Sequence, residues 1–254
     1  MNLGITSYFS ELVEHLGASW NRFWFAPRDP AALCGLRACV GALGFAWYWL
    51  LGQDFKYLFG ANGILPSGTE TAPGAWSFSW FDLASDPTAM SILYWAGLAI
   101  FACLAVGFLS RVMSVLALAL TLGVLHPMAM LISPFETVLV ILLLYLCLAP
   151  TGAAFSVDRW MRRNRPAVTS SYAATIATRL LQIHLVAIYA IMVLAKLRVP
   201  LWWTGLAVEW MSGKTDTRLV NVDEWPEYVL NAWTHAIVLF EATFPILIWN
   251  RLAR

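Results

Sequence analysis

The sequence predicts an all-α membrane protein: a polytopic bundle of about six transmembrane helices, preceded by an interfacial amphipathic helix. Hydrophobic residues make up 60% of the 254 residues and charged residues only 12%, against roughly 25% charged residues in a soluble domain. The apolar residues lie in stretches close to the roughly 20 residues that a helix needs to cross a bilayer. Fourteen tryptophans are typical of a protein with aromatic belts at both membrane surfaces.

Composition also limits the partners and metals. The net charge is only +1, and the basic residues are clustered in short loops, so we expect membrane lipids and no nucleic acid as partners. The four cysteines lie in apolar segments without a CxxC pair, which favours small core residues over a zinc site or thiol relay. The first residues lack the order of a cleaved signal peptide, so we expect the spans themselves to drive insertion.

The N-terminal segment, residues 5–24, has apolar side chains at helical spacing and Glu11, Glu14 and His15 on the opposite face. This amphipathic pattern predicts a helix that lies in the membrane interface. The sequence Pro27 to Pro30 should end this helix.

The first span is expected over residues 33–51. Arg37 lies one turn inside this span, and we expect its side chain to snorkel to the membrane surface. Residues 52–88 then form a long connection rich in glycine, proline and tryptophan, and a connection of this length is usually functional. The second and third spans are expected over residues 90–109 and 112–130.

Proline positions shape the third and fourth spans. His126 precedes Pro127, so the third helix should kink or end there. The fourth span, residues 135–148, is short for a bilayer. Glu136 begins it, and an anion at a helix N-terminus favours a capping role.

The fifth span, residues 179–198, carries the most polar groups. Gln182, Tyr189 and Lys196 repeat every seven positions and so share one helix face, with His184 to the side. An ionisable residue in hydrocarbon is costly unless paired, hydrated or snorkelling, which makes Lys196 a functional candidate. A snorkelling Lys196 and a satisfied core His184 are the structural alternatives.

The sixth span, residues 229–249, contains Glu241 well inside. This carboxylate has three candidate partners, Lys196, Arg37 and His235, and a structural pair competes with a catalytic role. The candidate ligands His126, His184, Glu136 and Glu241 show no i, i+3 or i, i+4 spacing, so we predict no metal site. A haem held by two of His126, His184 and His235 stays open.

Orientation follows from the arginines. Arg111, the cluster from Arg159 to Arg165, Arg251 and Arg254 share one side of the predicted membrane, and positive residues favour the cytoplasm. Both termini are therefore expected in the cytoplasm. The outward side then holds residues 52–88 and 198–227, including Trp202 and Trp203, which we interpret as interfacial anchors. With loops this short, a single membrane domain over residues 1–254 is expected.

Several motifs resemble one family. These are RACVGALGFAWYWLLGQDFKYLFGANGILP, WSFSW, VGFLSRV, ISPFETVLVILLLYLCLAPTGAAFSVD, LAKLRVPLWW and LFEATFPILIW, in this order. Their arrangement over residues 33–250 resembles the HTTM family, the membrane domain that vitamin K-dependent gamma-carboxylases share with many bacterial relatives. The most specific pieces are Gly63, Leu65 and Pro66, then Ser156 to Asp158, then Lys196 and Leu197.

The resemblance implies a chemistry. Carboxylase members oxidise a reduced quinone at an outward-facing site, and Lys196 resembles the lysine that deprotonates the hydroquinone. Quinone is then the implied cofactor or substrate, Glu241, His184, His126, Glu136 and Tyr189 are supporting polar groups, and a bacterial inner membrane is the implied location. Desolvation makes a lysine available as a base near neutral pH.

Two departures from the family pattern set up a competing hypothesis. The region LHPMAMLISPFE lacks the Asn/Arg-rich motif and the Gly-Gly-Asp element of many members, with Glu136 where the aspartate would fall. The chain also stops after the LFEATFPILIW helix, so we expect a reduced member without the large extramembrane domain. The competing hypothesis is a non-catalytic accessory or assembly subunit that binds a larger membrane complex through its tryptophan-rich outer loops.

Overall fold

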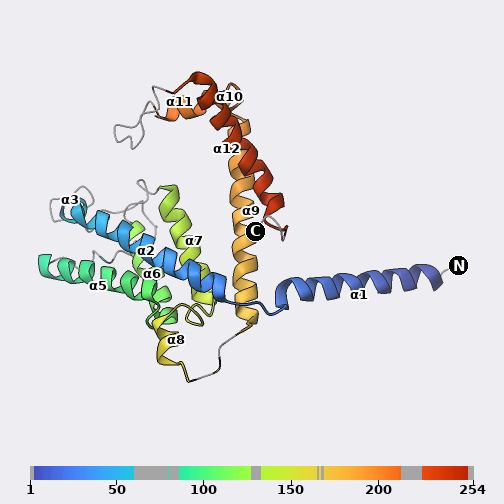
Figure 1. Ribbon diagram of the computed structural model, residues 1–254, viewed down its shortest axis with the longest axis horizontal. Coiled ribbons are helices and arrows are strands. Elements are labelled where there is room, and N and C mark those ends of the chain that lie inside the picture. Colours follow the sequence, from blue (N-terminus) through green and yellow to red (C-terminus); the bar gives the residue numbers. More distant parts are fainter. Residues whose placement is uncertain are drawn as a thin grey trace, which may run out of the picture. The chain divides into compact units, whose positions relative to one another are not determined.

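A computed structural model of the chain describes residues 3–59, 80, 86–126, 133–164, 166, 169–212 and 225–250. Helices dominate this part of the chain, and its β-structure is a single isolated bridge between Arg28 and Ser171 (Figure 1). The predicted all-α class is therefore confirmed. The chain divides into two compact units, Met1–Arg179 and Leu180–Arg254.

Four helices are long and apolar enough to cross a membrane, and the chain is an integral membrane protein. They are α2 (Ala31–Gln53), α5 (Pro87–Val106), α9 (Tyr172–Leu197) and α12 (Glu227–Leu247). Two more apolar helices are shorter, α6 (Ser110–Leu125) and α7 (Pro134–Leu148). Helix α1 (Leu3–Phe25) confirms the predicted N-terminal helix, and its place in the membrane interface stays a prediction.

The six apolar helices lie where the spans were predicted, with shifted ends, and that α6 and α7 also cross the membrane stays a prediction. Helix α6 ends at Leu125 with His126 as its C-cap, as expected, and Pro127 lies outside the described residues. Helix α9 begins seven residues earlier than expected and continues from the first unit into the second. The predicted connection over residues 52–88 lies mostly outside the described residues, as do residues 127–132 at the end of the expected third span.

The first unit has a core between α2, α5, α6 and α7. Helix α2 packs against α5 and α7, and α6 packs against the same two helices. Glycines allow α2 and α5 to approach closely, because a Cβ at Gly41 would overlap the backbone of Ala105, and one at Gly44 would overlap Phe101. The buried side chains between the helices include Tyr48, Leu104 and Leu143.

Arg37 does not snorkel as the sequence predicted. Its residue exposure is 0%, and its guanidinium donates to the carbonyl oxygens of Leu104 at 2.9 Å and Phe155 at 2.6 Å. Leu104 lies in the last turn of α5, where its carbonyl also accepts from the Gly107 N–H at 3.2 Å, and Phe155 lies in the loop before α8. Carbonyls at a helix end lack the donor that a continuing helix would supply. Arg37 is thus turned inward because the protein provides acceptors for it.

The turn between α5 and α6 depends on Gly107 and Asp158. Gly107 adopts a left-handed conformation, φ 77°, that ends α5, and Leu109 has φ 47°. Asp158, in the short helix α8 (Val157–Met161), accepts from the backbone N–H groups of Leu109 and Ser110 and from the Ser110 hydroxyl, each at 2.8 Å. The carboxylate caps α6 from another segment and holds Leu109 in a conformation that is costly for a residue with a Cβ.

The second unit is an antiparallel hairpin. Helix α9 ends at Leu197, two short helices, α10 (Pro200–Trp203) and α11 (Ala207–Ser212), follow, and α12 returns along α9 (Figure 1). Tyr189 in α9 contacts Phe244 in the last turn of α12, and Lys196 in the last turn of α9 contacts Glu241, an earlier residue of α12, which fixes the antiparallel direction.

Substituting Gly107 by alanine should destabilise the first unit. The new Cβ would sit in an unfavourable backbone conformation and overlap the Arg37 guanidinium, so we expect a loss of about 2–4 kcal/mol. Gly35→Ala in α2 is the matched control, because its Cβ meets nothing within 4 Å, and alanine favours helix by about 1 kcal/mol. Thermal unfolding in detergent measures both, and equal midpoints for the two variants would contradict the assignment.

Acid should remove the stabilisation that Asp158 provides. Burial opposes its ionisation, but hydrogen bonds from Ser110 and Leu109 and the charge of Arg162 outweigh burial and lower the pKa of the carboxyl. A lowered folded pKa means that the stabilisation is complete above the usual value of about 3.9 and is lost as pH falls through the folded pKa. The difference in unfolding midpoint between the wild type and Asp158→Asn should therefore be largest near pH 7 and shrink towards pH 3. A difference that is constant with pH would count against this role.

Candidate functional site

Lys196 and Glu241 form an ion pair in the second unit. The Lys196 ammonium, in the last turn of α9, donates to Glu241 Oε1 on α12. The ring of Trp202 covers the ammonium, with its centroid 4.5 Å from Nζ. A carboxylate and an aromatic face thus contact the same cation, and both contacts are stronger away from water.

The proline after α9 brings Trp202 over Lys196. Pro200 is the first residue of α10 and cannot continue α9, so the chain turns at Val199, whose N–H donates to the Lys196 carbonyl at 3.0 Å. The indole of Trp203 donates to the Leu197 carbonyl at 2.8 Å and satisfies the end of α9. The interpretation of both tryptophans as anchors therefore misses the contact that Trp202 makes with Lys196.

The second oxygen of Glu241 is left without a partner. Glu241 is buried, and its Oε2 has no hydrogen-bond partner among the described residues. A buried carboxylate oxygen without a donor is costly, and in native proteins it usually marks a functional role or a bound molecule. The site thus presents an ammonium and a free acceptor side by side.

An aromatic cluster lies along the hairpin below the pair. The Tyr189 ring lies 4.2 Å from that of Phe244 and 6.1 Å from that of Phe240, both on α12. Tyr189 and Lys196 therefore share the face of α9 that contacts α12, as their seven-residue spacing predicted. The cluster keeps this side of the pair apolar, which strengthens the interaction of the two charges.

The ion pair leaves one acceptor atom over. The Lys196 ammonium donates to Glu241 Oε1 and faces the Trp202 ring, whereas Glu241 Oε2 has no hydrogen-bond partner among the described residues. Of the two side chains, Glu241 is therefore the one with an oxygen left for a bound molecule.

Two of the predicted histidines lie elsewhere on the helices of the second unit. His184 is half-buried on α9, twelve residues before Lys196, which is about 18 Å along a helix axis. The ring nitrogens of His235 contact the Asn231 carbonyl at 2.8 Å and the Trp203 carbonyl at 3.3 Å. Of the candidate partners predicted for Glu241, it is therefore Lys196 that forms the ion pair. His126 ends α6 in the first unit.

Glu136 has a capping role in the first unit. It forms a capping box with Ser133 at the start of α7, and its Oε1 accepts from the Trp47 indole at 3.0 Å. The capping interpretation is thus confirmed. Arg37 is likewise absent from the ion pair, because its guanidinium donates to Leu104 and Phe155.

Sequence reasoning missed two features. Trp202 is one, although its position just after Pro200 indicates a chain reversal that returns it to α9. The other is Asp158, which the sequence pattern flagged only as part of a family motif and which caps α6. No group of three or more His, Cys, Asp or Glu residues that could hold a metal occurs in the described part of the chain.

Comparisons with protein-family models, with curated proteins and with solved structures gave no match.

A double-mutant cycle should detect strong coupling between Lys196 and Glu241. Lys196→Met or Glu241→Gln alone leaves a buried polar group without its partner, so each should cost about 3 kcal/mol. The double variant should cost much less than the sum, measured as unfolding free energy in bicelles. Arg198→Met is the matched control, because this exposed residue is two positions from Lys196, and its cycle with Glu241→Gln should be additive within about 0.5 kcal/mol. Additivity in both cycles would contradict the pair.

Proposed function

We propose that the chain is an HTTM-type membrane protein that removes a proton from a quinol-like, lipid-soluble hydroxyl compound at the Lys196–Glu241 pair. The motif resemblance supports the family and a bacterial inner membrane, and the arginine-rich loops support an orientation with both termini in the cytoplasm. On this topology the pair lies near the outward surface.

The observation that carries the proposal is the vacant Glu241 Oε2 beside a covered ammonium. A substrate hydroxyl that donates to Oε2 can pass its proton to the carboxylate, which yields a substrate oxyanion and a neutral Glu241. Neutralisation of Glu241 frees the Lys196 ammonium to pair with the oxyanion. The total charge is unchanged, so the transfer avoids placing a new net charge in a low-dielectric site.

The surroundings suit a substrate that arrives from the lipid. Aromatic rings line the hairpin below the pair, and several apolar side chains of α9 and α12 are exposed, among them Ile191, Leu194, Leu239 and Phe240. Rings of this kind can stack with a flat quinol head group. A lipid-soluble compound thus reaches the pair without crossing water.

A second candidate is an accessory subunit of a larger membrane complex. The observation in its favour is the exposure of Trp203, Trp210 and Trp233 on α10, α11 and α12. Exposed tryptophans are frequent anchors of protein interfaces and also of membrane surfaces. This function needs no proton transfer, so the experiment below separates it from the first.

The test is quinol oxidation in lipid nanodiscs. A hydroquinone loses two electrons and two protons to oxygen, giving quinone and hydrogen peroxide, and its anion reacts faster than the neutral form. We expect the protein to speed the air oxidation of a naphthohydroquinone, followed by absorbance. Lys196→Met and Glu241→Gln should each lower this catalysed rate at least about a hundredfold, the usual range for general bases.

Thr243→Val is the matched control, because this residue is two positions from Glu241 and its hydroxyl bonds only within its own helix. It should keep the catalysed rate. If the wild type gives no acceleration, or if both variants at the pair keep it, the proton-transfer function is wrong. A stoichiometric larger complex that persists in those variants would then favour the accessory subunit.

A further inference from the structure

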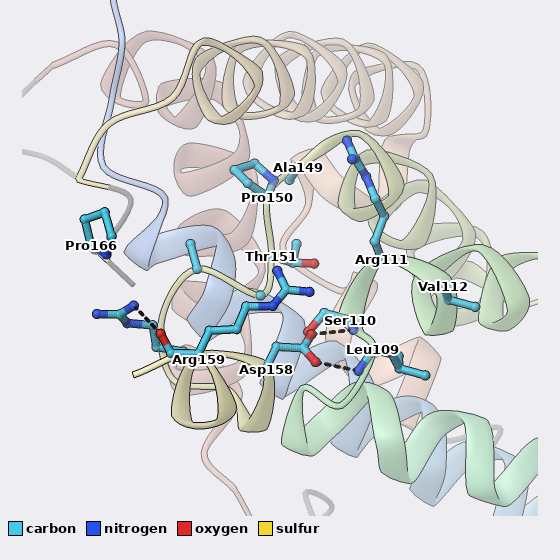
Figure 2. A pocket seen from close by; sticks show the side chains of 13 residues that line it. Leu109, Ser110, Arg111, Val112, Ala149, Pro150, Thr151, Asp158, Arg159 and Pro166 are labelled. Carbon is cyan, nitrogen blue, oxygen red and sulfur yellow. Dashed lines mark hydrogen bonds between the residues drawn. The ribbon is translucent and has the colours of Figure 1, made fainter. Parts of the chain in front are cut away.

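The first unit contains a cavity of about 550 Å³ that neither the fold nor the proposed function accounts for. It lies between the start of α6, the loop that follows α7, and α8 (Figure 2). Its lining includes Arg111, Arg159 and Arg162, together with Thr151 and Asp158. These residues come from three segments: the Asp158 cap joins α8 to the start of α6, and the Ser156 hydroxyl donates to the Gly152 carbonyl in the loop that follows α7.

The charge of the lining is positive. Three arginines and one aspartate give a net charge of 3 − 1 = +2 for the lining residues. Both Asp158 oxygens already accept hydrogen bonds, from Leu109 and Ser110, which Figure 2 shows as dashed lines. The carboxylate keeps its negative charge but has both oxygens occupied, and the three arginine charges exceed it, so the field in the cavity is positive.

Uncharged donors also face the cavity. Thr151 is 1% exposed, and its hydroxyl has no hydrogen-bond partner among the described residues, although it lines the cavity. At the start of α6, the backbone N–H groups of Leu109 and Ser110 donate to the Asp158 carboxylate. The next two backbone N–H groups along the helix belong to Arg111 and Val112. The first four N–H groups of a helix have no acceptor within the helix. A buried hydroxyl, two N–H groups and guanidinium groups form a donor set that matches the oxygens of a phosphate.

The cavity opens where apolar side chains are exposed. Leu109 and Val112 line it and are 46% and 52% exposed, and Trp160 and Met161 of α8 are exposed nearby in the sequence. Exposed tryptophan and aliphatic residues beside arginines are typical of the membrane–water interface. Phospholipid head groups lie at this depth.

We propose that this cavity is a binding site for a phosphate-bearing anion, as found in the head group of an anionic phospholipid. The arginines bind the phosphate oxygens, the Thr151 hydroxyl donates to one of them, and the apolar rim at Leu109 and Val112 contacts the first carbons of the acyl chains. The same donors fit a soluble phosphate ester, so the experiment includes both sources.

The test compares lipid retention by matched arginine variants. The purified full chain is placed in nanodiscs that contain phosphatidylglycerol or only phosphatidylcholine, and bound lipid is counted by native mass spectrometry. Arg111→Gln should lower phosphatidylglycerol retention about tenfold, the loss expected for one charge-assisted contact. Arg163→Gln is the control, because this exposed arginine follows Arg162 but does not line the cavity, and it should change retention less than twofold.

Thr151→Val provides a test that does not change charge. Loss of an unpartnered hydroxyl should not destabilise the fold, so thermal unfolding stays unchanged or improves while retention falls about tenfold. Inorganic phosphate and glycerol phosphate are titrated in parallel in phosphatidylcholine nanodiscs. Binding of these ions with no preference for phosphatidylglycerol identifies a soluble ligand.

Equal losses for Arg111→Gln and Arg163→Gln would show nonspecific surface attraction and overturn the site. Unchanged binding of every probe in Thr151→Val and Arg111→Gln would also overturn it.

Discussion

A polar group in an apolar helix bundle must find a partner, and this constraint explains the main features of the molecule. Arg37 is fully buried in the first unit because the Leu104 and Phe155 carbonyls accept from it. In the second unit, Lys196 donates to Glu241 and joins α9 to α12. In both cases a bond between separate helices or loops offsets part of the cost of burial, which makes polar side chains the links of an otherwise apolar fold.

The same constraint points to function where it is not met. Six buried side-chain atoms have no hydrogen-bond partner among the described residues, and two of them, Glu241 Oε2 and the Thr151 hydroxyl, lie beside groups that suit a ligand. The first lies beside an ammonium and next to exposed apolar helix faces, which suits a hydroxyl from the lipid. The second lies in a cavity lined by arginines, which suits a phosphate. The two vacancies differ in the charge around them, so they call for ligands of different chemistry.

The sequence was sufficient for the helices because hydropathy and length are local properties. The seven-residue spacing of Tyr189 and Lys196 also predicted their common face. The sequence did not reveal that the Arg37 side chain points inward, because snorkelling and burial differ only in whether carbonyl acceptors from distant parts of the chain are available. The choice among three possible partners for Glu241 likewise depended on contacts between residues far apart in the sequence. The contacts of Trp202 and Asp158 are made where the chain turns, at Pro200 and Gly107. Helical periodicity does not predict which residues such a turn brings together.

The central claim is that the Lys196–Glu241 pair is a site for a lipid-soluble hydroxyl compound. A cryo-electron microscopy map of the chain, purified from its native membrane into lipid nanodiscs, tests it most directly. We expect density for an elongated molecule with a polar atom about 3 Å from Glu241 Oε2, at hydrogen-bonding distance. A carboxylate covered only by protein side chains or acyl tails, with no polar atom in reach, would contradict the claim.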